Sequence, residues 1–124
     1  MFVLDEVQTG LYRTGPFLAA QHYGVEPDIA ILAKAISGGL VPTGAVMMSD
    51  GVYDSVYTSF KRSIIHTSTY SENGLSMRAG LATMDVLAES NLGERGEQLG
   101  RQLREKLAER LSPYDMIKDI AASG

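Results

Sequence analysis

Two residues of this chain, Lys34 and Asp5, have the types and the settings that reactive groups need. Lys34 lies in "ILAKAISGGLVPTG" (residues 31–44), where an apolar run ends in a glycine-rich loop. An amine in apolar surroundings loses its charge more readily and becomes a nucleophile that can form a Schiff base with an aldehyde. The glycines leave room for a bulky partner to approach the backbone. The alternative is a lysine that reaches solvent or pairs with a carboxylate.

Asp5 ends a second apolar run, residues 1–4. Pyridoxal phosphate needs a lysine for its aldehyde and a carboxylate for its ring nitrogen, which the carboxylate keeps protonated so that the ring can accept electrons. Asp5 and Lys34 are the residue types for these two roles. The alternative for Asp5 is an ordinary turn or cap residue.

The surrounding pattern indicates which elements would position these residues. Apolar runs predict short strands at 1–5, 29–33 and 44–48, with a further strand at 116–120, and an all-apolar run is typical of a parallel sheet. Helices are predicted at 17–23, 50–57, 72–89 and 92–111. Strands that alternate with helices predict an α/β architecture, whose chemistry lies beyond the carboxyl ends of the strands. Asp5 and Lys34 both follow a predicted strand, so we expect them to share one site.

The two long helices are predicted to be amphipathic. In residues 72–89 the side chains of Leu75, Ala79, Ala82 and Val86 share one face, and Leu81, Met84 and Leu87 widen it. In residues 92–111 leucines repeat every four residues, and the single short stripe favours ordinary packing over a coiled coil.

Composition excludes several classes of function. The net charge of −4 argues against nucleic acid or an acidic membrane surface as a partner. The absence of cysteine excludes disulfides and thiolate metal sites, and no metal is expected. No apolar run reaches the ~18 residues that span a bilayer. These features predict a soluble, cytoplasmic protein.

Three segments together resemble the class III aminotransferases. They are "LDEVQTGLYRTG" (4–15), "PDIAILAKAISGGLVPTGAV" (27–46) and "HTSTYSENGL" (66–75). This family of pyridoxal-phosphate enzymes includes ornithine, acetylornithine and 4-aminobutyrate aminotransferases. The resemblance implies an α/β fold that is part of the large cofactor-binding domain of the fold type I, aspartate aminotransferase-like enzymes.

The resemblance also implies roles for the first two segments. Lys34 would form the Schiff base with pyridoxal 5'-phosphate and carry the proton between the substrate Cα and the cofactor. Asp5 would pair with the pyridinium nitrogen. Val7 would pack on one face of the ring, and Gln8 would hydrogen-bond near the ring hydroxyl. Glu6 would be structural, in the loop that shapes the site.

The third segment implies a contribution across a dimer interface. Thr69 would give its hydroxyl to the cofactor phosphate of a neighbouring subunit, with Ser68 beside it. The chain departs from the usual family pattern at Thr67 and Gly74, which puts the local turn in doubt but leaves Thr69 in place.

Members of this family are much longer than 124 residues, so we expect this chain to be a section of a larger enzyme. The resemblance assigns residues 1–112 to the central part of the pyridoxal-phosphate-binding large domain. It assigns residues 113–124 to the start of the connection to a C-terminal small domain.

The implied activity is a ping-pong transamination by a homodimer. An amino acid or amine would give its amino group to a 2-oxo acid such as 2-oxoglutarate or pyruvate. An aminomutase, racemase or decarboxylase on the same scaffold is the alternative, because these enzymes share Asp5 and Lys34. A non-catalytic truncated chain, or an interaction module built on the helix at 92–111, is a further alternative.

Overall fold

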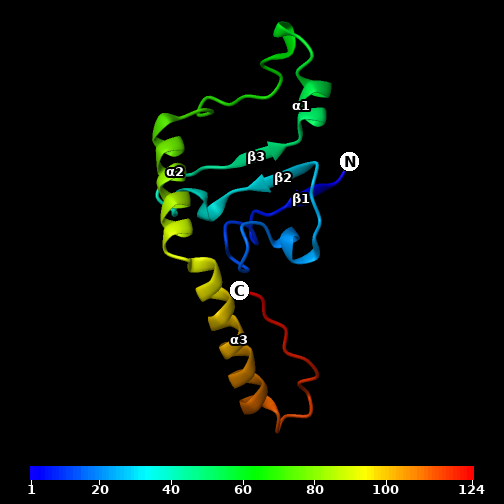
Figure 1. The fold of residues 1–124 in the computed structure, drawn as a ribbon, viewed down its shortest axis with the longest axis vertical. Coiled ribbons are helices and arrows are strands. Elements are labelled where there is room, and N and C mark those ends of the chain that lie inside the picture. Colours follow the sequence, from blue (N-terminus) through cyan, green and yellow to red (C-terminus); the bar gives the residue numbers. More distant parts are fainter.

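The computed structural model describes all 124 residues and shows a three-stranded sheet flanked by helices (Figure 1). The strands are β1 (Val3–Asp5), β2 (Ile29–Leu32) and β3 (Ala45–Met48). The α-helices are α1 (Asp50–Val56), α2 (Gly74–Glu89) and α3 (Leu92–Leu111), and three 3₁₀ turns are η1 (Ala19–Tyr23), η2 (Lys34–Ser37) and η3 (Phe60–Arg62). The predicted α/β architecture is confirmed.

The sheet is mixed rather than wholly parallel. β1 pairs with β2 in parallel, with Asp5 opposite Ile31, whereas β3 runs antiparallel to β2, with Ala45 opposite Leu32. A parallel return would need a crossover, usually a helix, but residues 33–44 contain only the turn η2. The chain therefore reverses, and the ends of β1 and β2 meet the start of β3 at one edge of the sheet, which we call the site edge.

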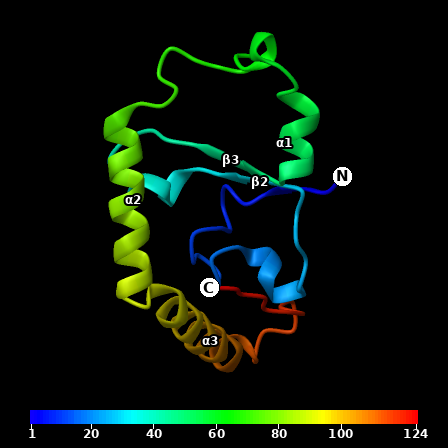
Figure 2. The same cartoon turned by 45° about the horizontal axis from the view of Figure 1, so that its top comes forward.

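α2 lies beside the sheet, where it contacts η2 (Figure 2). Asn73 caps the helix, because its side-chain oxygen accepts the backbone N–H groups of Leu75 at 3.0 Å and Ser76 at 3.2 Å. The buried residues of α2 are the small Ser76 and Gly80, which let the helix backbone approach η2. The predicted apolar face is only partly covered: Leu87 packs against the core, whereas Leu75 is 68% accessible and Val86 55%.

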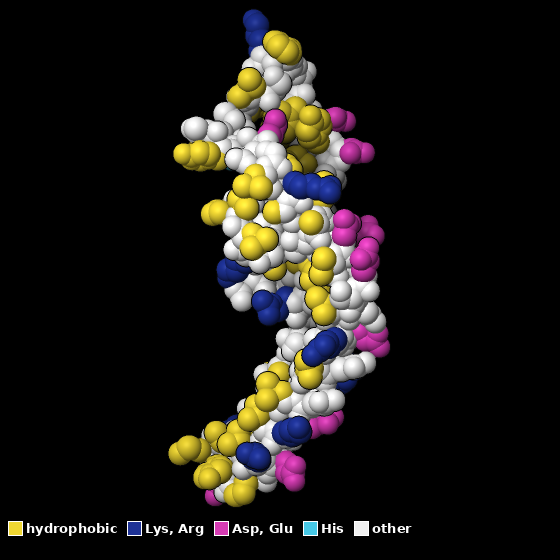
Figure 3. Space-filling model, turned by 90° about the vertical axis from the view of Figure 1, so that its left-hand side faces the viewer, with side chains coloured by type: hydrophobic (Ala, Val, Ile, Leu, Met, Phe, Trp, Pro, Cys, Tyr) yellow, Lys and Arg dark blue, Asp and Glu magenta, His cyan; other side chains and the backbone are white.

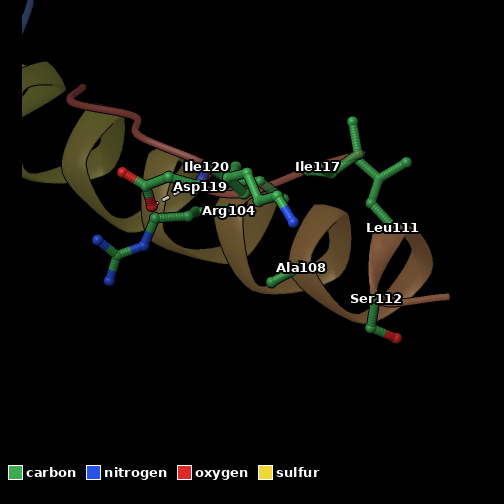
Figure 4. A pocket seen from close by; sticks show the side chains of 8 residues that line it. Arg104, Ala108, Leu111, Ser112, Ile117, Asp119 and Ile120 are labelled. Carbon is green, nitrogen blue, oxygen red and sulfur yellow. Dashed lines mark hydrogen bonds between the residues drawn. The ribbon is translucent and has the colours of Figure 1, made fainter. Parts of the chain in front are cut away.

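α3 continues from α2 at an angle set by Asn91, whose backbone is left-handed with φ 48° (Figures 1 and 2). It spans the predicted residues 92–111. Residues 112–124 then run back beside it without forming a strand, so the strand predicted at 116–120 is wrong. Ile117 and Ile120 lie against the C-terminal half of α3, around a hollow of about 380 Å³, where no strand is available for pairing (Figure 4).

The hydrophobic core lies under the loops that follow β1 and β2. Its buried members are Leu11, Leu32 and Ile36, and Phe17 and Leu87 pack against them. Only 13 of the 124 residues are buried, so this core is small. Many hydrophobic side chains over α2 and along α3 remain at the surface (Figure 3). No helix combines the length and apolar character needed to cross a membrane.

Candidate active site

Asp5 and Lys34 both lie at the site edge. Asp5 is the last residue of β1, and Lys34 follows β2 after a single residue, Ala33. Because β1 and β2 are parallel and in register, their carboxyl ends bring the two residues to the same side of the sheet. They form no ion pair, since the salt bridges of the chain join Met1 to Asp28 and Arg101 to Glu97. The structure thus places an amine and a carboxylate at one edge of the sheet with no ion pair between them.

The backbone of Lys34 adopts an unusual conformation. Its φ of 50° lies in the left-handed region, which costs a residue with a side chain about 1–2 kcal/mol. Lys34 is also the first residue of η2 and is exposed, although its apolar neighbours in the sequence predicted apolar surroundings. Strained backbone of this kind persists only where the surrounding structure holds it in place.

Ser37 holds the loop that follows Lys34. It is 1% exposed, and its Oγ donates to the carbonyl oxygen of Val41 and accepts the Val41 N–H at 3.3 Å. Both hydrogen bonds close the glycine-rich segment on itself. In the sequence, a serine between an apolar residue and two glycines carries no distinguishing signal, so the role of Ser37 is apparent only in the structure.

The segment after β1 reaches across to Lys34. The Lys34 amine donates a hydrogen bond to Oε1 of Gln8. Asp5 fixes the start of this segment, because its Oδ1 accepts the N–H of Val7 at 3.0 Å. Its other carboxylate oxygen makes no hydrogen bond within the chain. The structure therefore brings Asp5, Val7, Gln8 and Lys34 together.

Glu6 holds this segment against η1 and β2. It is 4% exposed, and its Oε1 accepts the backbone N–H of Ala20 at 3.0 Å while Oε2 accepts the hydroxyl of Thr9. Its own backbone N–H donates to the carbonyl oxygen of Ile31 at 3.0 Å, which extends the β1–β2 pairing by one hydrogen bond. Glu6 therefore anchors the turn that carries Val7 and Gln8.

Ser68 and Thr69 lie elsewhere, in the exposed loop between η3 and α2. The Ser68 N–H donates to Oγ of Ser71 at 2.9 Å, and the two hydroxyls are 3.1 Å apart. Ser68 lines a hollow of about 720 Å³ between this loop and β3, whereas Thr69 does not. No hydrogen bond connects Ser68 or Thr69 to Asp5, Gln8 or Lys34, so the structure does not bring these two residues into the group at the site edge.

The residues at the site edge fit a cofactor that carries an aldehyde and a basic ring nitrogen. The amine of Lys34 is exposed and free of any carboxylate, as attack on an aldehyde requires. The uncommitted oxygen of Asp5 is available to accept a hydrogen bond from a protonated nitrogen. The donor set therefore agrees with the chemistry of pyridoxal phosphate.

Comparison with known proteins gives the class of the chain. It matches the family of class III aminotransferases over residues 1–124. The chain therefore belongs to the class III aminotransferase family.

Solved structures agree with this assignment. Ornithine aminotransferase from Toxoplasma gondii, which holds pyridoxal phosphate at partial occupancy in its active site, is 39% identical with a TM-score of 0.88. Acetylornithine aminotransferase from Elizabethkingia anophelis is 36% identical with a TM-score of 0.88, and an (S)-enantioselective omega-transaminase from Thermomicrobium roseum is 34% identical with a TM-score of 0.89.

These matches cover 98%, 100% and 98% of this chain but 28%, 30% and 27% of the three relatives, in the same order. The chain thus spans less than a third of their length. Over that length the likeness confirms the predicted fold, which is part of the fold type I architecture.

Proposed function

We propose that this chain supplies the lysine and the ring-nitrogen carboxylate of a pyridoxal-phosphate-dependent aminotransferase. The observation that carries the proposal is the placement of Lys34 and Asp5 at one sheet edge with no ion pair between them. Membership of the class III family supports it. The relative from Toxoplasma gondii, which holds the same cofactor, supports it further.

Four residues would hold the cofactor at the site edge. The amine of Lys34 would bind its aldehyde carbon, and the free carboxylate oxygen of Asp5 would accept the N–H of its ring. Val7 and Gln8, which the turn after β1 places beside them, would contact the ring face and its hydroxyl. When bound, the cofactor supplies the electron sink for reaction at the substrate Cα.

Lys34 would have a second task once the substrate amine has displaced it. Its Nζ would take the proton from the substrate Cα and deliver it to the cofactor. The exposed amine on a flexible four-carbon stem suits this movement. Asp5 would meanwhile keep the ring nitrogen protonated.

Ser68 and Thr69 would serve the phosphate of a cofactor bound to a second copy of the chain in a homodimer. Their exposure and their separation from Lys34 support a role in another subunit's site. The full enzyme would then contain two sites, each built from both subunits.

The proposed reaction moves an amino group from an amino acid or amine to a 2-oxo acid such as 2-oxoglutarate or pyruvate. Relatives named as ornithine aminotransferase, acetylornithine aminotransferase and omega-transaminase support this class of donor. The short share of each relative that the chain covers supports the further proposal that residues 1–112 are the central part of a large domain and residues 113–124 lead to a small one.

Borohydride reduction of the full-length protein with its cofactor tests the central assignment. Reduction fixes the cofactor to the lysine that carries it, and peptide mapping then identifies that lysine. We expect the pyridoxyl group on Lys34, and a label on Lys61, Lys106 or Lys118 instead would refute the proposal. Assays of both half-reactions, with amino donors and then 2-oxo acids, distinguish transamination from other chemistry on the same residues.

A further inference from the structure

The contact between Lys34 and Gln8 joins the two loops of the site edge without any cofactor. Lys34 donates from Nζ to Oε1 of Gln8, and this is the one hydrogen bond that its amine makes within the chain. The two residues are 26 positions apart in the sequence, so the contact depends on the β1–β2 pairing and not on local structure. Gln8 therefore has a partner in the chain itself.

Gln8 is held in position by its neighbours. Asp5 accepts the N–H of Val7 at 3.0 Å, and the carbonyl oxygen of Glu6 accepts the N–H of Gly10 at 2.9 Å, so the turn is closed on both sides of Gln8. The buried side chain of Glu6 ties the same turn to Ala20. These bonds hold the backbone of Gln8, and its neutral amide oxygen accepts the hydrogen bond of the amine.

The choice of a neutral acceptor matters for an amine that must react. A carboxylate at this place would hold the amine in its charged form by a charge-assisted hydrogen bond, which is stronger than a neutral one. An amide oxygen can accept from an amine N–H and still release it. Asp5, the carboxylate at the same edge, forms no ion pair with Lys34.

We infer that Gln8 is a positioning residue that holds the Lys34 amine whenever the amine is not joined to the cofactor. This inference rests on the proposed function, in which Lys34 is released and rejoined in every catalytic cycle. Gln8 would keep the free amine at the site edge, ready to return. This role is additional to the contact with the ring hydroxyl that the family resemblance implies.

The test measures the reactivity of Lys34 in the cofactor-free full-length protein. Acetic anhydride is applied briefly at neutral pH, and mass spectrometry gives the acetylation rate at Lys34 relative to Lys61, Lys106 and Lys118. We expect Gln8→Leu to raise the relative rate at Lys34 by about threefold, the effect of losing one exposed hydrogen bond. Gln8→Glu keeps the acceptor and adds charge, so it should lower the rate below that of the unmodified protein.

A matched control is Gln102→Leu, the same substitution at an exposed position on α3. It should leave the rate at Lys34 unchanged. An unchanged rate in Gln8→Leu, or a raised rate in Gln8→Glu, would overturn the inference. A general loosening of the loop predicts the same direction for both variants at Gln8, so the opposite directions identify the hydrogen bond.

Addition of pyridoxal phosphate separates this inference from the proposed function. If Lys34 binds the cofactor, pyridoxal phosphate protects it from acetylation while the other three lysines react as before. Failure of that protection would refute the proposed function. The relative acetylation rates at Lys34 in Gln8→Leu and Gln8→Glu, measured without cofactor, decide the role of Gln8 independently.

Discussion

The buried carboxylate of Glu6 accepts the backbone N–H of Ala20 at 3.0 Å, which joins the end of β1 to the start of η1. No basic side chain pairs with this carboxylate. Only hydrogen bonds therefore satisfy the buried carboxylate of Glu6. Glu6 is adjacent to Asp5 in the sequence and two residues before Gln8. The bond to Ala20 ties the turn that carries Val7 and Gln8 to η1.

Replacement of Glu6 by alanine should destabilise the protein. The substitution leaves the N–H of Ala20 without its acceptor in a buried setting, which costs about 1–3 kcal/mol of unfolding free energy. Urea denaturation of the full-length protein measures the change. Glu26→Ala is the matched control, because Glu26 is exposed and makes no hydrogen bond within the chain, and it should change stability by less than about 0.5 kcal/mol. Equal stabilities for the two variants would contradict the anchoring role of Glu6.

Gly38 and Gly24 offer a matched pair for testing how tightly η2 is packed. Both have left-handed backbone, with φ of 64° and 62°. A Cβ at Gly24 would meet nothing within 4 Å, whereas one at Gly38 would lie 3.2 Å from Oγ1 of Thr83 on α2. Replacement by alanine should cost about 1 kcal/mol at Gly24 through backbone conformation alone and more at Gly38.

Denaturation of both variants measures the difference. Addition of Thr83→Ala to Gly38→Ala should recover part of the excess, because it removes the atom that the new Cβ meets. If both glycine variants lose the same stability, the contact between η2 and α2 is looser than the structure shows.

Much of the fold follows from periodicity and from turn residues. The helix at 92–111 agrees with α3 because a four-residue leucine repeat bounded by Pro113 admits few alternatives. The placement of Asp5 and Lys34 at one edge follows from two apolar runs that end at polar residues. Parallel strands bring such ends together whatever their loops contain.

The remaining features depend on tertiary contacts that no local pattern encodes. The antiparallel direction of β3 depends on how the loop at 33–44 folds. The composition of a loop does not determine its geometry, so the sequence did not predict this reversal. The face of α2 that packs is the one with Ser76 and Gly80, because η2 approaches its backbone closely. Hydrophobicity predicted a face centred on Leu75 and Val86, about a quarter to a third of a turn away. The hydrogen bond from Lys34 to Gln8 joins distant segments, so only the assembled sheet reveals it.

Asp5→Asn should separate cofactor binding from catalysis. Asparagine keeps an oxygen that can accept the N–H of Val7, so the turn should survive. It removes the charge that, in the proposed role of Asp5, keeps the ring nitrogen protonated. We expect cofactor to bind and transamination to fall by about a hundredfold or more. Absorbance of the bound cofactor and steady-state rates measure the two effects, with Asp54→Asn on exposed α1 as control. Turnover close to normal in Asp5→Asn would contradict the proposed role.

Thr69→Val should weaken cofactor binding while the fold persists, because Thr69 is exposed and makes no hydrogen bond within the chain. In the proposed role Thr69 donates one hydrogen bond to the cofactor phosphate, and its loss should raise the Kd for pyridoxal phosphate by about tenfold. Titration by absorbance or fluorescence measures it. Thr58→Val, at another exposed loop position, is the control and should leave the Kd unchanged.

Hybrid dimers test whether Thr69 acts across the subunit interface. A dimer of one Lys34→Ala subunit and one Thr69→Val subunit contains one fully intact site only if Thr69 serves its partner's site. Such a hybrid should therefore regain about half of the normal activity at a cofactor concentration too low for Thr69→Val itself. Activity as low as that of the parent homodimers would show that Thr69 acts within its own subunit.

Expression of residues 1–124 alone should give a loosely packed protein with weak cofactor binding and no turnover. The chain buries few side chains, and large hydrophobic residues such as Leu75, Leu81 and Leu103 lie at its surface. An apolar surface this extensive, on a chain with so small a core, favours association over a unique fold.

Lys34 and Asp5 would still meet at the site edge, but Thr69 would contribute only if a dimer formed. Sedimentation measures the association, and absorbance during titration with pyridoxal phosphate measures the binding. A monodisperse protein that binds one cofactor per chain tightly and transfers amino groups would show instead that these residues form a self-sufficient enzyme.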